Sequence, residues 1–554
     1  MTRRVRRQLE KKRTEDWKAQ NWKKHQRNVY RLQRRIYQAA RRGDWKRVHR
    51  LQRLLLRSWS ARCLAVRRVS QDNRGKKTAG VDGVKNLSLQ QRLRLARELA
   101  NLTGWRVAPI RRTYIPKPGT TEKRGLGIPV MADRAMQALV KQALEPEWEA
   151  QFEPNSYGFR PGRSTHDAVV AIQITICLKP KYALDADIEK CFDRINHDAL
   201  LKKLRTTPPI MRLVRDWLKA GILDEGKWLF PEAGTPQGGV ISPLLANVAL
   251  HGLERTLVAV SKRHRITVIR YADDLVVLCQ DLETLLAAKA KAEEWLAEMG
   301  LCLKEAKTHV THTLNEHEER VGFDFLGFHV RQHRVGRYRT RTYRGRPGYR
   351  TLITPAKKGV KRHMEKIREL VHQDRGAPQS ALIAALNPVV RGWAQCYRIC
   401  VAKRIFSKID HLMHWGLMRW AKHRHPEKSY QWREHRYWRR QELRKVFSDG
   451  THTLRQHSET PIVRHVKVRG DKSPYDGDWV YWGARLGRDS TKPRRVIRLL
   501  KQQQGRCGRC GLPLTTEDVM ETHHRDGDRQ NNRYTNLALL HAHCHDQAHG
   551  GQHQ

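Results

Sequence analysis

The tetrapeptide Tyr271-Ala-Asp-Asp274 constrains the fold most, because it joins two short apolar runs, Ile266–Ile269 and Leu275–Leu278. Runs rich in valine, isoleucine and leucine predict a strand, a tight turn and a second strand. Two adjacent carboxylates at a hairpin tip repel each other unless a positive group neutralises them. A pair of divalent cations held by carboxylates would do so and is what nucleotidyl transfer requires, although the motif alone also fits an exposed turn without metal.

A second acidic run lies upstream, where Lys181–Ile188 alternates as a strand does. Asp185 and Asp187 face one side of this predicted strand, and Leu184 and Ala186 face the other. If both runs belong to one sheet, a carboxylate of the upstream strand can lie beside the Asp273-Asp274 turn. We therefore expect Asp187 to lie close to that turn.

The order of these motifs resembles the palm of reverse transcriptases. Asp187-Ile-Glu-Lys-Cys-Phe192 is similar to motif A of that family, and Tyr271-Ala-Asp-Asp274 is similar to motif C. The resemblance implies that Asp187, Asp273 and Asp274 are catalytic and hold Mg²⁺. It also implies that Phe192 excludes a ribose 2′-hydroxyl, which would make the enzyme synthesise DNA; a core aromatic is the alternative for Phe192.

The composition points to a polyanionic partner. The 554 residues include 109 Lys and Arg against 55 Asp and Glu, a net charge of +54, and such a charge favours nucleic acid as the partner. A membrane is the weaker alternative, because the sequence has no run of about 18 apolar residues. With no secretory signal visible and most cysteines scattered, we expect a reducing compartment, the bacterial cytoplasm or nucleoid, with an organelle left open.

Residues 1–70 form a basic helical extension in this interpretation. Apolar residues recur at helical spacing on both sides of a Gly43-Asp44 break, which predicts two amphipathic helices with basic outer faces. Such faces suit contact with phosphates, and a solvated pair of charged helices is the alternative.

Residues 71–350 are expected to form the fingers and palm. Tyr114–Pro129 reads as strand, turn and strand, so that Lys117 and Arg124 can face each other and bind a triphosphate. Tyr157–Ala168 ends in a helix start that Ser164 can cap. This part is similar to the reverse transcriptase of group II intron-encoded proteins, and the resemblance implies that Lys117, Arg124 and Arg163 lie near the incoming nucleotide; plain surface cations are the alternative.

The loop Gly234-Thr-Pro-Gln237-Gly-Gly239 is constrained by its proline and glycines and opens a helix. A side-chain amide held rigidly there could contact a sugar hydroxyl or a base edge. The matching loop of the family packs against the nucleotide, which implies a substrate contact for Gln237. A structural turn with an exposed glutamine is the alternative.

The region after the palm changes to helical periodicity. Residues 351–430 predict three helices, which suggests a thumb, and the resemblance implies a maturase or X domain that grips intron RNA. Residues 431–495 lose this periodicity but stay basic and aromatic. We interpret them as a segment that contacts DNA.

The final segment, 496–554, carries two sets of metal-ligand residues. Cys507, Cys510, His541 and Cys544 have the spacing of a structural Zn²⁺ site, with His543 as the alternative fourth ligand. The remaining histidines follow the order of an HNH nuclease. The predicted cation ligands are His523, His545 and His549, with His524 as general base and Asn536 to orient its ring; a histidine-rich tail that buffers zinc is the alternative.

Together these features predict an α+β multidomain chain with a right-hand polymerase, an antiparallel palm sheet, a helical thumb and a small ββα-metal nuclease. The resemblance implies RNA-directed DNA polymerisation from dNTPs, binding of a group II intron RNA during splicing, and cleavage of target DNA for target-primed reverse transcription, or retrohoming. Mg²⁺ would serve the polymerase and the nuclease, and Zn²⁺ the tail. The alternatives are a non-catalytic splicing cofactor and a homing endonuclease with a basic recognition domain.

Overall fold

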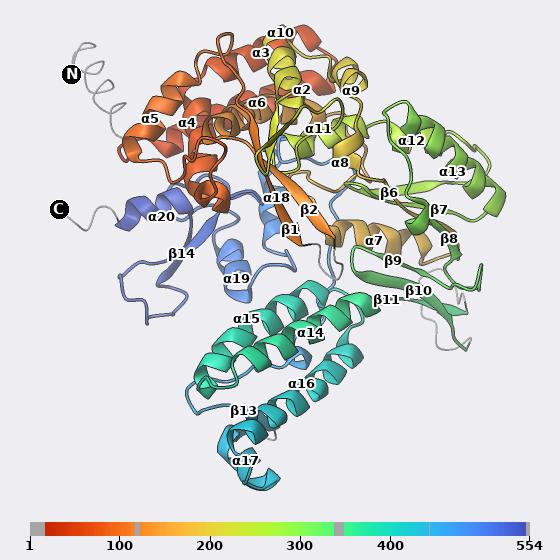
Figure 1. The fold of residues 1–554 in the computed structure, drawn as a ribbon, viewed down its shortest axis with the longest axis vertical. Helices are drawn as coiled ribbons and strands as arrows, with labels where there is room; N and C mark the ends of the chain where they lie inside the picture. Colours follow the sequence, from red (N-terminus) through yellow and green to blue (C-terminus); the bar gives the residue numbers. More distant parts are fainter. Residues whose placement is uncertain (1–16, 117–121, 337–347, 443, 550–554) are drawn as a thin grey trace.

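The structure is a computed structural model that describes residues 17–116, 122–336, 348–442 and 444–549. Figure 1 shows the N-terminal helices packed above the palm and beside the C-terminal segment, with the thumb helices projecting away at the opposite end. Within the described residues, none of the helices has the length and apolar character needed to span a bilayer.

The N-terminal part is helical, as its periodicity predicts. The expected break falls at Gly43, whose φ of +72° ends the first helix, and at Asp44, whose side chain accepts a hydrogen bond from the Arg47 amide to cap the next one. The apolar stripes of both helices are buried against α6 and their basic residues face outward. The elements are α2 (Trp22–Arg41), α3 (Trp45–Arg57), α4 (Trp59–Arg67), η1 (Arg68–Asp72), η2 (Arg74–Lys77), α5 (Leu89–Glu98) and α6 (Met131–Glu149).

The fingers contain a four-stranded sheet in the order β2-β1-β4-β5. The predicted strand-turn-strand is its first hairpin, in which Ile115 pairs with Arg124. The last two strands come from a hairpin about a hundred residues later in the chain. The strands are β1 (Ile110–Pro116), β2 (Lys123–Ile128), β4 (Ile222–Asp224) and β5 (Lys227–Leu229).

The palm sheet is antiparallel, as predicted, in the order β6-β7-β3-β8. Its strands are β3 (Tyr182–Asp187), β6 (Thr267–Tyr271), β7 (Asp274–Cys279) and β8 (His309–His312). The helices around it are α7 (Thr165–Ile176), α8 (Cys191–Arg194), α9 (His197–Leu204), α10 (Pro208–Leu218), α11 (Ser242–Ala249), α12 (Leu253–Val258) and α13 (Leu282–Ala297), with the short turn η3 (Glu305–Lys307) before β8. Ser164 and Asp167 form the capping box of α7, which confirms the predicted helix start.

A second antiparallel sheet joins the palm to the thumb. Its strands are β9 (Phe323–Phe325), β10 (Phe328–Arg334) and β11 (Tyr349–Pro355). Phe323, Phe325 and Phe328 are buried in the core. Three helices follow, α14 (Lys357–Gln373), α15 (Gln379–Tyr397) and α16 (Lys403–Arg424), and their apolar faces form a core of their own. This arrangement confirms the expected helical thumb at the level of secondary structure.

The chain then crosses back along the molecule. Beyond the thumb lie α17 (Tyr430–Tyr437), β12 (Trp438–Gln441), β13 (Arg444–Phe447), η5 (His457–Glu459), α18 (Trp479–Leu486), α19 (Arg494–Gln502), β14 (Met520–His524), β15 (Leu537–His541) and α20 (Ala542–His549). Residues 461–478 form neither helix nor strand, but they are anchored to the palm, because Asp167 accepts hydrogen bonds from Arg485 and from the Val468 amide.

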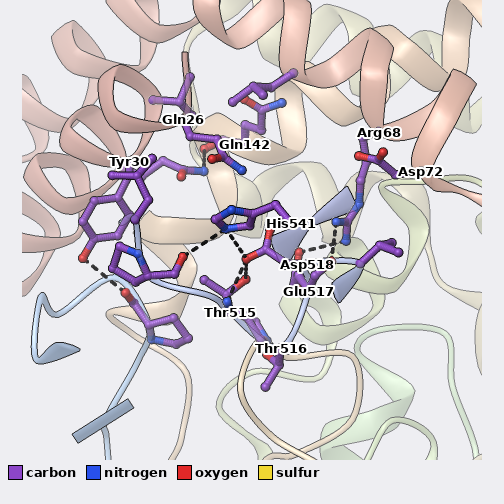
Figure 2. Close-up of a pocket in the computed structure, with 18 of the residues that line it drawn as sticks. Gln26, Tyr30, Arg68, Asp72, Gln142, Thr515, Thr516, Glu517, Asp518 and His541 are labelled. Carbon is purple, nitrogen blue, oxygen red and sulfur yellow. Dashed lines mark hydrogen bonds and ion pairs between the residues drawn. The ribbon is translucent and has the colours of Figure 1, made fainter. Parts of the chain in front are cut away.

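The C-terminal ββα segment packs against the N-terminal helices. Arg68 pairs with Glu517 at 3.1 Å, and Arg67 lies 3.6 Å from Asp546. A cavity of about 500 Å³ lies between the two parts, and Figure 2 shows Gln26 and Tyr30 on one wall and Thr515 to Asp518 on another. The two ends of the described chain therefore form one packed unit.

Candidate active site and metal centres

The palm brings three carboxylates together. β3 pairs with β7 so that Asp187 lies directly opposite Asp274. The β6–β7 hairpin turns at Ala272 and Asp273, with Ala272 at φ +57°. The Ile188 amide donates a hydrogen bond of 3.1 Å to the Asp273 carbonyl, which fixes the turn beside the end of β3. The predicted proximity of these residues, far apart in sequence, is therefore confirmed.

A glycine contact sets the position of this turn. The Tyr157 amide donates to the Arg270 carbonyl at 2.9 Å, so the 156–158 segment runs beside β6. A Cβ added at Gly158 would lie only 2.3 Å from the Ala272 nitrogen. The backbone carrying Asp273 therefore packs so closely that residue 158 has no room for a side chain.

The acidic cluster carries more negative charge than the chain itself neutralises. Burial raises the pKa of Asp274 to about 7, and the charges of Asp273 and Asp187 add to the rise. Burial likewise raises the pKa of Asp185 to about 7, with Asp274 contributing. Lys307 forms an ion pair with Asp187. Such clustered carboxylates favour a cation, and carboxylate oxygens are ligands that Mg²⁺ prefers in proteins, so the donor set fits.

Phe192 and Gln237 line one pocket of about 210 Å³ between palm and fingers. Phe192 is half-buried, and its side chain packs against the core and also lines the pocket, so a core position and a pocket position occur together. The side-chain amide of Gln237 donates a hydrogen bond of 3.2 Å to Asp193, and the backbone carbonyl of Gln237 accepts one from the backbone amide of Gly127 at 2.7 Å. The loop is thereby fixed to β2, as its proline and glycines indicate.

The predicted nucleotide cations have different surroundings. Arg124 is exposed on β2, and its positive charge acts to lower the pKa of Asp273, which burial raises. Lys117 lies outside the described residues. Arg163 donates hydrogen bonds to the carbonyls of Pro154 and Gly470, at 2.6 and 2.9 Å. Through these bonds the Arg163 guanidinium holds the 461–478 stretch to the palm, and its expected contact with the nucleotide stays a prediction.

The cysteine-rich cluster assembles with the predicted residues. The ligand atoms of Cys507, Cys510, His541 and Cys544 all lie within 4.8 Å of one another, and all four residues are buried. The strand β15 ends at His541 and α20 carries Cys544, so the strand-to-helix junction closes the site. The His541 Nε2 lies 3.7 Å from Asp518, the kind of outer partner that metal-bound histidines have. His541, and not the alternative His543, joins the thiols, and the set fits Zn²⁺.

A second cluster contains the ring nitrogens of His523, His545 and His549, which also lie within 4.8 Å of one another. His523 comes from β14, whereas His545 and His549 are one turn apart on α20. The His545 Nδ1 lies 2.7 Å from Glu521, which fixes the ring. Three imidazoles at this spacing can hold a divalent cation with coordination positions left for water and substrate.

Asn536 does not hold the ring of His524 in the way that the sequence suggests. Its amide donates to Asp526 at 2.8 Å and to the Asn531 carbonyl at 2.9 Å, and its oxygen accepts from the Asp526 amide. The strand register pairs His524 with Leu537, so the asparagine side chain turns into the loop between the strands. Asn536 therefore braces this loop, while the buried His524 Nε2 has no hydrogen-bond partner among the described residues.

Sequence reasoning assigned no role to three residues at these sites. Asp185 shares a strand face with Asp187, and the alternation of the run was the signal that could have included it. Lys307 and Glu521 reach their partners through tertiary folding, so neither has a local signature.

Comparisons with known proteins agree with this architecture. A family model described as reverse transcriptase (RNA-dependent DNA polymerase) matches residues 115–330. The N-terminal domain of reverse transcriptase matches residues 17–99, and the group II intron, maturase-specific domain matches residues 360–438.

Two curated relatives show the extent of the similarity. Protein YkfC of Escherichia coli (strain K12) is 32% identical over 353 residues, which cover 56% of this chain and 89% of that protein. Group II intron-encoded protein LtrA of Lactococcus lactis subsp. cremoris is 36% identical over 188 residues, which cover 33% of this chain and 31% of LtrA. With the palm carboxylates, the matched domains and these relatives together, the chain belongs to the family of group II intron reverse transcriptases/maturases.

Proposed function

We propose that the palm copies RNA into DNA with Asp187, Asp273 and Asp274 as its Mg²⁺ ligands. The observation that carries this proposal is the pairing of Asp187 with Asp274 beside the Asp273 turn. The bound ions would supply activation of the primer 3′-hydroxyl and stabilisation of the leaving pyrophosphate. The carboxylates hold and orient the ions, and their clustering explains why a cation is needed for all three to ionise at neutral pH.

The pocket beside this cluster would take the sugar of the incoming dNTP. Phe192 lines this pocket, where its ring would exclude a 2′-hydroxyl, and Gln237 is held by the Gly127 and Asp193 contacts. The charges of Arg124 and Lys307 both act on Asp273. Because Lys307 is paired with Asp187, we assign Arg124 to the triphosphate. Lys117 keeps the same assignment from its sequence position alone.

Intron RNA is the proposed polyanionic partner. The maturase-specific match covers most of the thumb, and α2 and α3, which lie within the match for the N-terminal domain, turn their basic faces to solvent. Helix faces with a high density of positive charge are stabilised by bound phosphates, because like charges that are not neutralised repel one another. Binding there would let the protein assist splicing of the intron, and the match to a group II intron, maturase-specific domain supports this proposal.

The tail would cut DNA. In this proposal Zn²⁺ is held by Cys507, Cys510, His541 and Cys544, and a catalytic cation by His523, His545 and His549. His524, with its unpartnered Nε2, takes the proton of the attacking water. A nick in the target DNA would provide the 3′-hydroxyl from which the palm copies intron RNA, as in target-primed reverse transcription.

The polymerase assignment is tested by primer extension on an RNA template with Asp273→Asn. We expect extension to be lost, whereas Asp216→Asn, which removes a surface carboxylate paired with Arg212, should extend as the parent does. Extension by Asp273→Asn at the parental rate would show that these carboxylates do not catalyse it, and absence of extension by the parent itself would favour the non-catalytic splicing cofactor instead.

The nuclease assignment is tested separately by nicking of labelled target DNA with His549→Ala. We expect nicking to be lost while primer extension persists. Nicking that survives in His549→Ala and in a chain lacking residues 496–554 would refute a nuclease in the tail. If His549→Ala loses nicking and the parent chain shows no primer extension, the homing endonuclease alternative would be favoured.

A further inference from the structure

An apolar surface on the fingers has no partner within the described part of the chain. Trp228, Leu229 and Phe230 follow one another at the end of the β4–β5 hairpin and are 54%, 43% and 76% exposed. Consecutive large apolar side chains this exposed are uncommon on a soluble surface and mark a binding site. We refer to the side chains of these three residues as the hairpin surface.

The backbone under the hairpin surface keeps its two rings together. Trp228 and Phe230 are two residues apart in extended chain, so they project to the same side. A Cβ added at Gly221 would lie 3.3 Å from the Phe230 ring and 3.6 Å from the Trp228 ring. Both rings therefore lie over the bare backbone of Gly221 and together form an exposed platform.

The hairpin surface is continuous with the proposed nucleotide site. Leu229 and Phe230 line the same pocket of about 210 Å³ as Phe192 and Gln237. β4 pairs with β1, so the hairpin is an extension of the sheet that carries Arg124. A strand that supplies a base to the palm would therefore pass this hairpin.

The charges nearby favour a nucleic acid strand as the occupant. β1 and β2 carry Arg111, Arg112, Lys123 and Arg124 and no acid. The acid of the neighbouring β4, Asp224, is already engaged, because it accepts a hydrogen bond from Tyr114 at 2.6 Å and lies 3.9 Å from Arg112. Two exposed acids, Glu225 in the hairpin turn and Glu232 after Phe230, lie at the edges of this surface, and the four cations of β1 and β2 outnumber them. Cations beside exposed aromatic rings are the combination that binds unpaired strands, with the phosphates on the cations and the bases on the rings.

We propose that Trp228 and Phe230 stack on unpaired bases of the RNA template before they enter the palm. This inference rests on the proposed function, because the strand to be copied must be single-stranded ahead of the site of synthesis. Stacking tolerates every base, since each has a flat π-face, so a copying enzyme can use it along any template. The rings would hold the template in line with Phe192 and Gln237.

The test measures binding of the full chain to a DNA primer annealed to RNA, without dNTPs, by fluorescence anisotropy at fixed salt. One substrate is blunt and the other carries an unpaired 5′ RNA extension. We expect Phe230→Ala to weaken binding of the extended substrate by about fivefold or more, since stacking on one ring contributes roughly 1–3 kcal/mol. Binding of the blunt substrate should change less than about twofold.

Two variants serve as controls. Phe230→Tyr keeps an aromatic ring and should bind the extended substrate as the parent does. Ile174→Ala removes an apolar side chain that is 58% exposed on α7, outside the hairpin surface, and should change neither substrate. Trp228→Ala gives an independent second reading of the platform.

Three results would overturn the inference. The first is equal binding of the extended substrate by Phe230→Ala, Trp228→Ala and the parent. The second is an equal loss of binding for the blunt and the extended substrate. The third is a change of oligomeric state in place of a change in binding, which would assign the hairpin surface to a second copy of the chain. Because no nucleotide is incorporated, failure of this assay is distinct from failure of Asp273→Asn to abolish extension.

Discussion

A single methyl group at Gly158 should misplace the catalytic turn. The Cβ of Gly158→Ala would lie 2.3 Å from the Ala272 nitrogen, 2.9 Å from the Tyr271 carbonyl carbon and 3.0 Å from the Ala272 Cα. All three atoms are backbone, so no side-chain rotation relieves the contact. Ordinary contact would require the turn to move by about 1 Å, and a displacement of that size at reacting groups can lower a rate by about 100-fold.

The cost should be seen in catalysis more than in folding. Overpacking of this kind typically destabilises a protein by about 1–3 kcal/mol, whereas Asp273 and Asp274 move with the turn and lose their register with Asp187. We expect single-turnover primer extension by Gly158→Ala to slow by about 100-fold at saturating dNTP, with a chain that still unfolds cooperatively.

The matched control is Gly416→Ala in α16, where an added Cβ meets nothing within 4 Å. Alanine favours a helix interior over glycine by up to about 1 kcal/mol, so this variant should be at least as stable as the parent and equally active. Extension by Gly158→Ala within about threefold of both the parent and Gly416→Ala would refute the claim that this contact sets the turn.

Three further outcomes follow from other parts of the chain. Burial lowers the pKa of His363 to about 3, and the charge of His457 adds to the shift. His363 stays neutral in the folded chain but takes up a proton in the unfolded chain below its ordinary pKa near 6.5, so the free energy of unfolding, measured by thermal unfolding, should fall by up to about 1.4 kcal/mol per pH unit from pH 6.5 down to 4. A His363→Asn variant that keeps the full slope would contradict this. Cys544→Ser should remove about one zinc per chain by elemental analysis, whereas Cys396→Ser, at an exposed cysteine outside the cluster, should not; equal zinc in both would exclude the proposed ligand set. Asn536→Ala should abolish nicking and speed amide exchange in residues 525–536 without affecting primer extension, and unchanged exchange there would show that the bonds to Asp526 and Asn531 do not brace the loop.

The palm could be predicted from the sequence because its signals are local and repeat with period two. Alternation placed Asp187 on a strand face, and the apolar runs around Asp273-Asp274 predicted the hairpin, so only the pairing of the two strands remained to be found. The clustering of the tail's cysteines and histidines was predictable for a related reason: their spacing along the chain is typical of metal ligands, and the structure brings them together.

The remaining features depend on contacts between distant parts of the chain. Arg163 bonds the Gly470 carbonyl, 307 residues away, and Arg68 meets Glu517 across 449 residues. No periodicity or spacing records such a pair, so the sequence does not show that a basic residue in a loop also anchors a distant segment. Asn536 shows that sequence reasoning also fails at short range. The strand register, which the sequence does not give, decides whether its side chain contacts the ring of His524 or the loop between β14 and β15.

Those anchors bear on how two proposed chemistries share one chain. Asp167 and Arg163 fix the 461–485 stretch to the palm, and Arg68 fixes the C-terminal ββα segment to the N-terminal helices. The tail is therefore packed onto the polymerase and does not hang from a free linker. A DNA end produced at the histidine cluster would be released beside the protein that is to extend it, at a local concentration far above that of an end in free solution. If that coupling operates, disrupting Arg68–Glu517 should lower extension from self-made nicks more than extension from an added primer. Equal effects on both substrates would show that the packing has no part in the transfer.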